Sequence, residues 1–274
     1  MNPETITKLC VLNNAFYRDN SVSFSETRQS PWPGWTRCLE VLRYARTDGR
    51  LGGWADDYSD DQRAFSVFDL ACGNLRFENF LASALPETTF TVHAVDNCDC
   101  LVPPMSNTNY QSLDILNTLQ NGLCLNDQLT APLCDLAVSF GFLHHIPLRE
   151  YREEVLASLL RQTRPGGFVI VSLWQFLNDE TLAKQAQITH ERAIKELDLP
   201  TLDDNDYLLG WKNLPNTYRY CHSFSEIEID RLIESVVSKP LRTDSASASV
   251  STVARFASDG RTANLNTYLI LKVF

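Results

Sequence analysis

The stretch FDLACGNLRF, from Phe68 to Phe77, decides the fold. It follows an apolar strand expected over Phe65 to Leu70 and turns on small residues into a helix expected over about Phe77 to Leu85. In a doubly wound α/β sheet, such a turn lets the backbone approach a ligand and points N–H groups at it from a helix N-terminus. The sequence therefore predicts a nucleotide-like ligand beside Asp69, Ala71, Gly73 and Asn74.

Further strands and helices alternate after this turn. Strands are expected over Phe90 to Asp96, Cys134 to Phe140 and Phe168 to Trp174, with a helix over Arg149 to Gln162. Strands separated by helix-length patterns predict βαβ units and a parallel sheet.

Two further positions fit a bound nucleoside. Asp96 ends the second strand 23 residues after Gly73, where a carboxylate with its neighbour Asn97 can hold the two ribose hydroxyls. Asp114 stands beside Ile115, a pairing suited to an exocyclic amine next to an adenine face. The alternative interpretation of Asp114, as a helix N-cap, stays open. Phe140 completes the predicted cofactor set at the end of its strand.

The segment CDLAVSFGFLHHIP, from Cys134 to Pro147, runs from a buried strand into two histidines. Open α/β sheets bind ligands at the carboxyl ends of their strands. We therefore expect His144 or His145 to face the cleft, although a structural role is the alternative for each.

Composition, charge and cysteine spacing argue against several classes of protein. The chain has 274 residues, is 44% hydrophobic and carries a net charge of −10 from 34 acidic and 24 basic side chains. That balance disfavours a surface coated for nucleic acid, although arginines concentrate between Arg18 and Arg50. The eight cysteines show neither zinc-ligand nor disulfide spacing, so no metal site is predicted. The opening MNPETITKLC lacks the features of a signal peptide, so we expect a cytoplasmic protein without a membrane span.

Well ahead of the predicted core lies FSETRQSPWPGW, from Phe24 to Trp35. Its prolines restrict the backbone, so Arg28 can be held over the cleft at low entropic cost. A guanidinium there is a candidate clamp for a carboxylate or phosphate, unless it only pairs with Glu26 or a helix end. Trp32 and Trp35 are expected to attach N-terminal helices, Pro3 to Phe16 and Trp35 to Ala45, to the sheet rather than to stack on a base.

Together these motifs resemble the class I S-adenosylmethionine-dependent methyltransferases. DLACGNLRF is similar to their D-x-G-C-G-x-G turn, with Ala71 and Leu75 where glycines are usual, and RPGG follows at Arg164 to Gly167. FSETRQSPWPGW resembles the F-S-x-T-R-x-x-P-W-P signature of the wobble-uridine tRNA methyltransferases, which methylate a carboxymethyl group on the anticodon uridine. SLWQ, DYLLGWK, YRYCHSFSEIEIDRL and NTYLILKVF are similar to later segments of that family.

The resemblance implies a fold and an organisation. It implies an α/β, Rossmann-like, doubly wound and mostly parallel seven-stranded sheet in a single methyltransferase domain, 1–274. Within it we expect N-terminal helices and a substrate segment (1–47), a cofactor-binding core (65–174), an insertion capping the substrate pocket (176–217), and a C-terminal helix and strands (218–274). Arg219 and His222 are predicted to close the site opposite Arg28, or alternatively to fix the insertion to the core.

Three functions follow from these expectations. The first is S-adenosylmethionine-dependent methylation of a tRNA wobble uridine, for which the eukaryotic family also implies a small zinc-binding activator subunit. The second is methylation of a small-molecule carboxylate or hydroxyl, which the acidic net charge and the acidic tract LDDND in the insertion favour. The third is a non-catalytic scaffold whose altered glycine turn no longer supports turnover.

Overall fold

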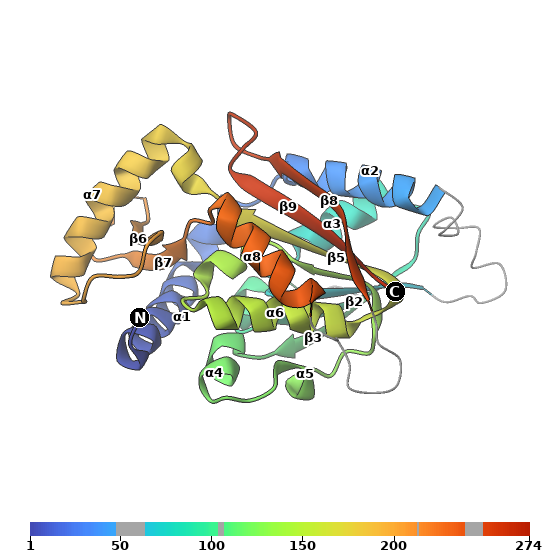
Figure 1. Ribbon diagram of the computed structural model, residues 1–274, viewed down its shortest axis with the longest axis horizontal. Helices are drawn as coiled ribbons and strands as arrows, with labels where there is room; N and C mark the ends of the chain where they lie inside the picture. Colours follow the sequence, from blue (N-terminus) through green and yellow to red (C-terminus); the bar gives the residue numbers. More distant parts are fainter. Residues whose placement is uncertain (48–63, 104–106, 213, 239–248) are drawn as a thin grey trace.

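The computed structural model describes residues 1–47, 64–103, 107–212, 214–238 and 249–274 (Figure 1). The Gly-rich acidic stretch 48–63, which its sequence predicts as a surface loop, lies outside the described residues. No described helix is long and apolar enough to cross a bilayer.

A seven-stranded sheet forms the centre of the molecule. Its strands are β1 (Phe65–Leu70), β2 (Phe90–Asp96), β3 (Thr108–Ser112), β4 (Cys134–Ser139), β5 (Thr163–Trp174), β8 (Val250–Ser258) and β9 (Asn266–Val273). The spatial order is β3-β2-β1-β4-β5-β9-β8. All pairs from β3 to β5 are parallel, whereas β9 runs antiparallel to β5 and β8 antiparallel to β9. The predicted α/β, mostly parallel seven-stranded fold is confirmed.

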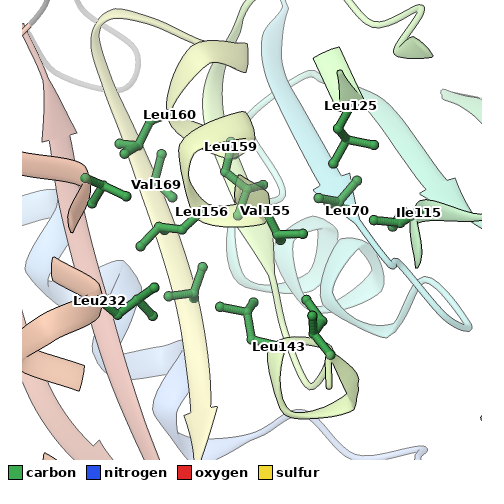
Figure 2. Close-up of a cluster of buried hydrophobic side chains, with 14 of the residues drawn as sticks. Leu70, Ile115, Leu125, Leu143, Val155, Leu156, Leu159, Leu160, Val169 and Leu232 are labelled. Atoms are coloured by element: carbon green, nitrogen blue, oxygen red, sulfur yellow. The ribbon is translucent and has the colours of Figure 1, made fainter. Parts of the chain in front are cut away.

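Helices cover both faces of this sheet (Figure 1). They are α1 (Pro3–Glu26), α2 (Pro33–Thr47), α3 (Arg76–Ala84), α4 (Ile115–Gln120), α5 (Leu125–Gln128), α6 (Arg149–Gln162) and α8 (Glu226–Val237). On one face, Leu156 and Leu159 of α6 and Leu232 of α8 pack against Leu70 and Val169 of the sheet (Figure 2). Burial of each such leucine contributes about 1.5–3 kcal/mol.

The opposite face is covered by α2 and α3, whose apolar residues pack against the other sides of β1, β4, β5 and β9. Trp35 is 2% exposed and contacts the rings of Phe77, Phe80 and Phe140. Next to it, Gly34 is required, because a Cβ there would lie 2.1 Å from the Tyr268 ring. The Gly34 N–H also donates to Asp259 Oδ1 over 3.0 Å, so the Pro-Trp-Pro-Gly-Trp segment is fixed to the C-terminal hairpin.

The segment after β5 forms a small unit beside the main sheet. The helix α7 (Glu180–Glu196) precedes β6 (Asp206–Gly210), which pairs antiparallel with β7 (Tyr218–His222). In Figure 1 this unit lies to one side of the main sheet, next to α1. Leu9 of α1 joins Leu208 and Tyr220 in a separate apolar cluster that holds the unit in place.

The first helix is longer than predicted. It was expected to end near Phe16, but α1 continues to Glu26 and caps on Thr27. No proline or glycine interrupts residues 17–26, and the side chains of Asn20, Ser21 and Ser23 hydrogen-bond to carbonyls of the preceding turn. The extension brings Tyr17 and Phe24 to the carboxyl end of the sheet.

Candidate active site

A cavity of about 670 Å³ lies at the carboxyl ends of the parallel strands. All nine residues predicted to bind the cofactor line it: Asp69, Ala71, Gly73, Asn74, Asp96, Asn97, Asp114, Ile115 and Phe140. Of the predicted acceptor residues, Arg28, His144, His145 and Arg219 also line it, and His222 does not. The structure thus brings segments from the whole length of the chain to one site.

Three residues of the glycine turn have left-handed backbone conformations, although only one of them is a glycine. Ala71, Gly73 and Leu75 have φ values of 67°, 56° and 54°, all in the left-handed region. A Cβ on Gly73 would meet nothing within 4 Å, so the backbone there faces open space. The turn is held by Ala71 N–H and Cys72 N–H, which both donate to Val95 O.

Leu75 replaces a glycine without entering the cavity. Its side chain is fully buried and packs with Cys72, Val92 and Ala94 on the far side of the turn. Leu75 is therefore not among the residues that line the cavity.

The two carboxylates predicted to contact a nucleoside are already oriented. Asp96 accepts the N–H of Gly73 at Oδ2 and the N–H of Cys98 at Oδ1, each over 2.9 Å. Asp114 is also the N-cap of α4, so the alternative interpretation is confirmed alongside its place in the cavity. Its Oδ2 accepts from Asn14 Nδ2 over 2.7 Å, and Asn14 Oδ1 accepts from Asn97. The side-chain amide of Asn14 on α1 therefore links Asp114 to Asn97 at the wall of the cavity.

Two carboxyl groups meet beneath the glycine turn. Asp69 and Glu78 are 3% and 2% exposed, and Asp69 Oδ1 and both carboxyl oxygens of Glu78 are buried without a hydrogen-bond partner among the described residues. Burial raises the pKa of Asp69, with Glu78 adding to the shift, and burial also raises the pKa of Glu78. We conclude that the pair holds a proton, because two adjacent ionised carboxylates are not stable without water or a cation.

The two histidines lie side by side at the cavity wall. His145 donates from Nδ1 to Tyr220 O over 2.9 Å and accepts the Tyr17 hydroxyl at Nε2 over 2.5 Å. Burial lowers its pKa to about 3, and burial, then His145, Arg219 and Arg28, lower that of His144. Both rings are therefore neutral near pH 7. His144 Nδ1 is buried without a hydrogen-bond partner among the described residues.

Two arginines give the acceptor side a positive charge. Arg219 is 7% exposed, and it donates a hydrogen bond to an uncharged group, the carbonyl oxygen of Gly210, over 3.3 Å. The Arg28 guanidinium lies 4.3 Å from the Phe24 ring centroid and donates to Thr27 Oγ1. Neither forms an ion pair with a described carboxylate, so pairing of Arg28 with Glu26 is excluded. Burial lowers the pKa of Arg28, and Arg219 lowers it further.

The structure separates the roles of the two tryptophans. Trp35 attaches α2 to the sheet as expected, whereas Trp32 lines the cavity beside Gly141, where a Cβ would lie 3.2 Å from the Trp32 ring. Asn74 donates to Arg28 O and Ser25 Oγ, which ties the Arg28 segment to the glycine turn.

The prediction that His222 belongs to the acceptor site is wrong, because His222 does not line the cavity. It is 2% exposed and lies between two carboxylates, with Nδ1 2.7 Å from Asp206 Oδ1 and Nε2 3.1 Å from Glu228 Oε1. Its role is therefore to hold β6 and β7 to the start of α8, which is the alternative prediction. The partner Asp206 lies sixteen positions away on another strand, which the sequence pattern did not reveal.

The insertion, residues 176–217, does not have the capping position that was predicted for it. None of the described residues in 176–217 lines the cavity, so the segment does not cap it. Instead Trp211 lies behind the arginines, 5.5 Å from Arg219 and 5.9 Å from Arg28 measured from ring centroid to guanidinium carbon.

Sequence reasoning also missed lining residues whose signals were weak. Asn14 lay in the predicted first helix, Tyr17 just beyond its expected end, Arg76 in the turn before the next predicted helix, and Trp174 at the end of a predicted strand.

The chain is similar in sequence to known methyltransferases, although at low identity. No family model matches the chain. It is 26% identical over 162 residues to the mouse (Mus musculus) tRNA (carboxymethyluridine(34)-5-O)-methyltransferase ALKBH8, covering 58% of this chain and 19% of that protein. It is 23% identical over 158 residues to the Arabidopsis thaliana tRNA (carboxymethyluridine(34)-5-O)-methyltransferase, of which it covers 31%. The chain thus spans only about a fifth of the mouse relative's length and less than a third of the Arabidopsis relative's length.

Solved structures share the fold. A SAM-dependent methyltransferase from Methanosarcina mazei aligns with a TM-score of 0.50 and 15% identity, over 77% of this chain and 92% of its own. The complex of DhpI with SAM and HEP aligns with a TM-score of 0.50 and 15% identity, over 96% of this chain and 97% of its own. The chain therefore has the fold of the class I S-adenosylmethionine-dependent methyltransferases.

The residues that line the cavity fit S-adenosylmethionine. The open backbone at Gly73 leaves room for the methionine part, and Asp96 keeps free lone pairs toward the cavity. Asp114 and Ile115 can hold the adenine edge and face, and the buried Asp69 lies where a cationic amino group would be stabilised. When bound, this cofactor supplies an electrophilic methyl group on a sulfonium.

Proposed function

We propose that this chain transfers the methyl group of S-adenosylmethionine to a carboxylate oxygen, and that the carboxylate is the carboxymethyl group of a tRNA wobble uridine. The observation that carries the proposal is the buried Arg219, which forms no ion pair with a described carboxylate and which lines, together with Arg28, the cavity that also contains the glycine turn. A buried guanidinium without a carboxylate partner is costly, and an anionic substrate would supply that partner.

The charges of the cavity are divided in a way that suits this reaction. The lining carboxylates Asp69, Asp96 and Asp114 come from β1, from the end of β2 and from the start of α4, whereas Arg28 follows α1 and Arg219 belongs to β7. A cationic cofactor and an anionic acceptor are therefore each bound by groups of opposite charge. Arginine presents two parallel donors, so it can hold one carboxylate oxygen in line with the methyl group.

The chemistry needs no proton transfer. In the step, a carbon–oxygen bond forms and the carbon–sulfur bond breaks, which leaves a neutral ester and a neutral thioether. A carboxylate is already a nucleophile, so the two neutral histidines need not act as bases. His145 instead holds Tyr17 in place, and His144 offers Nδ1 as a hydrogen-bond partner for the acceptor.

The tRNA acceptor is supported by the relatives named above, both of which are described as carboxymethyluridine methyltransferases. The net charge of −10 favours a second candidate, a small-molecule carboxylate held by the same arginines. A zinc-binding activator subunit remains a prediction of the family resemblance. Cytoplasmic localisation likewise stays a prediction from the sequence.

A pair of variants tests the division of the cavity. Asp96→Ala should abolish binding of S-adenosylhomocysteine measured by calorimetry. Arg219→Ala should keep that affinity within about threefold but lower methyl transfer by roughly 100-fold, because about 3 kcal/mol of charge-assisted hydrogen bonding is lost. Equal loss of cofactor affinity in both variants would contradict the assignment.

A further inference from the structure

Two thiols touch in the loop that follows the predicted ribose-binding carboxylate. Cys98 and Cys100 flank Asp99 just after β2, at the start of the short helix η1 (Asp99–Leu101). Their Sγ atoms lie 3.1 Å apart. Cys98 is buried and Cys100 is exposed, so one thiol of the pair is open to solvent and the other is shielded.

The two thiols differ in reactivity. Hydrogen bonds from the Ser21 hydroxyl and from Cys98 lower the pKa of Cys100. Burial, with the hydrogen bond to Cys100, raises the pKa of Cys98 to about 12. Because the thiolate is the reactive form, Cys100 is the thiol that a soluble oxidant attacks first.

We propose that Cys98 and Cys100 form a reversible disulfide on exposure to a hydroperoxide, and that this bond weakens cofactor binding. In the first step the Cys100 thiolate attacks the peroxide; a sulfur–oxygen bond forms, the oxygen–oxygen bond breaks, and the leaving oxygen takes a proton. In the second step Cys98 attacks the resulting sulfenic acid; the sulfur–sulfur bond forms and the hydroxide leaves with the Cys98 proton as water.

The electrons balance across the two steps. Two thiols lose two electrons and two protons in total, and one hydroperoxide is reduced to an alcohol and water. When the oxidant is hydrogen peroxide, two waters are produced. A dithiol reductant reverses the reaction by thiol–disulfide exchange.

The disulfide would act on the cofactor site through three contacts. Closing it draws the sulfurs from 3.1 Å to about 2.05 Å. The loop that must shift includes the Cys98 N–H, which holds Asp96 Oδ1, and the Cys98 carbonyl, which accepts the N–H of the cavity residue Leu101. Cys98 Sγ also lies 3.8 Å from Tyr17 O on α1. This consequence rests on the proposed function, because it assumes that Asp96 holds the cofactor.

Mass spectrometry tests the bond itself. The reduced full-length protein is treated with hydrogen peroxide, free thiols are alkylated with iodoacetamide, and the peptide containing both residues is measured. We expect that peptide to lose two hydrogens and to resist alkylation until dithiothreitol is added. Cys98→Ser should leave a sulfenic acid on Cys100 that dimedone traps, and Cys124→Ser, which removes another exposed thiol, should change nothing. A wild-type protein that shows only single-site oxidation of Cys100, or a bond to another cysteine, would overturn the proposal.

Calorimetry with S-adenosylhomocysteine tests the consequence. Peroxide should raise the Kd of the wild type at least fivefold, with recovery on reduction, and should leave the Kd of Cys98→Ser unchanged. A disulfide that forms while the Kd stays constant would disprove the coupling. If the untreated protein binds no S-adenosylhomocysteine, the proposed function fails, whereas the mass of the peptide still decides whether the disulfide forms.

Discussion

Ala71, Gly73 and Leu75 share one backbone conformation, but they bear different costs for it. The left-handed region is open to glycine and costs an ordinary residue about 1–2 kcal/mol. Ala71 bears that cost with little compensation, since it is only partly buried, whereas the Leu75 side chain is completely buried in the core. A sequence with one glycine of the usual three can therefore still form the turn.

Glycine substitutions at Ala71 and Leu75 should have opposite effects on stability. Ala71→Gly should raise the free energy of unfolding by about 0.5–1 kcal/mol, because strain is relieved. Leu75→Gly should lower it by about 2 kcal/mol or more, because the lost burial exceeds the relieved strain. Urea denaturation measures both, and a stabilised Leu75→Gly protein would contradict the buried position of this side chain.

The Asp69–Glu78 pair predicts a pH dependence of stability. Both native pKa values lie above the ordinary values of 3.8 and 4.5, so the native state keeps a proton that the unfolded chain releases as the pH rises. Stability therefore falls as the pH rises from about 4.5 toward the native pKa, by up to about 1.4 kcal/mol per pH unit for each proton.

Glu78→Gln should flatten this fall, because the amide stays neutral at every pH. Urea unfolding at several values between about pH 5 and pH 8 measures the slope. Glu87→Gln, at an exposed position just after α3, is the matched control and should keep the wild-type slope. An identical slope in Glu78→Gln and the wild type would show that the pair does not hold the proton.

At the scale of elements, apolar patterns predicted the central strands and helices well. β1, β2 and α6 have the bounds expected from the sequence, since each combines a buried apolar pattern with clear turn residues at its ends. β3 was missed because its sequence, TNYQS, is that of a polar edge strand without apolar alternation. The pairing of β6 with β7 was missed because it depends on contacts with α1 and α7, which the local sequence does not encode.

The site residues could be predicted from the sequence where a titratable side chain lies at or just after the carboxyl end of a predicted strand. Asp69, Asp96 and the histidines each come at the carboxyl end of a parallel strand or just after it, so their meeting follows from the fold. His222 also belongs to a strand, but that strand lies in the small second sheet, and only the structure shows which carboxylates face it.

The cluster around His222 predicts a structural phenotype. His222→Ala leaves Asp206 and Glu228 without their shared partner, and removing one member of a buried charged network costs about 3 kcal/mol. We expect that loss in urea denaturation, with the Kd for S-adenosylhomocysteine within about twofold of the wild type. Loss of methyl transfer at unchanged stability would return His222 to the acceptor site.

At the scale of the whole molecule, charge bears on the choice of acceptor. The net charge of −10 opposes binding of RNA, whereas the cavity itself presents Arg28, Arg76 and Arg219. Burial, with Arg28 adding, lowers the pKa of Arg76 to about 10, so this arginine remains charged near neutral pH. The positive charge needed for an anionic acceptor is therefore concentrated at one site.

Salt separates the two candidate acceptors. If tRNA is the substrate, kcat/KM should fall at least about tenfold between roughly 50 and 200 mM salt, because cations are released from its phosphates on binding. A small carboxylate should show less than about a threefold change over the same range. A shallow dependence measured with tRNA would argue that the RNA backbone is not bound.

The central claim, methyl transfer to a carboxylate, has one direct test. The protein is incubated with S-adenosylmethionine labelled in the methyl group and with tRNA carrying the carboxymethyl group, and the acid-precipitable label is then treated with mild alkali. We expect label in the tRNA that alkali releases as methanol, because a methyl ester hydrolyses under these conditions. Label that enters the tRNA but resists alkali would contradict the claim, because it would place the methyl group on a nitrogen, a carbon or a hydroxyl oxygen.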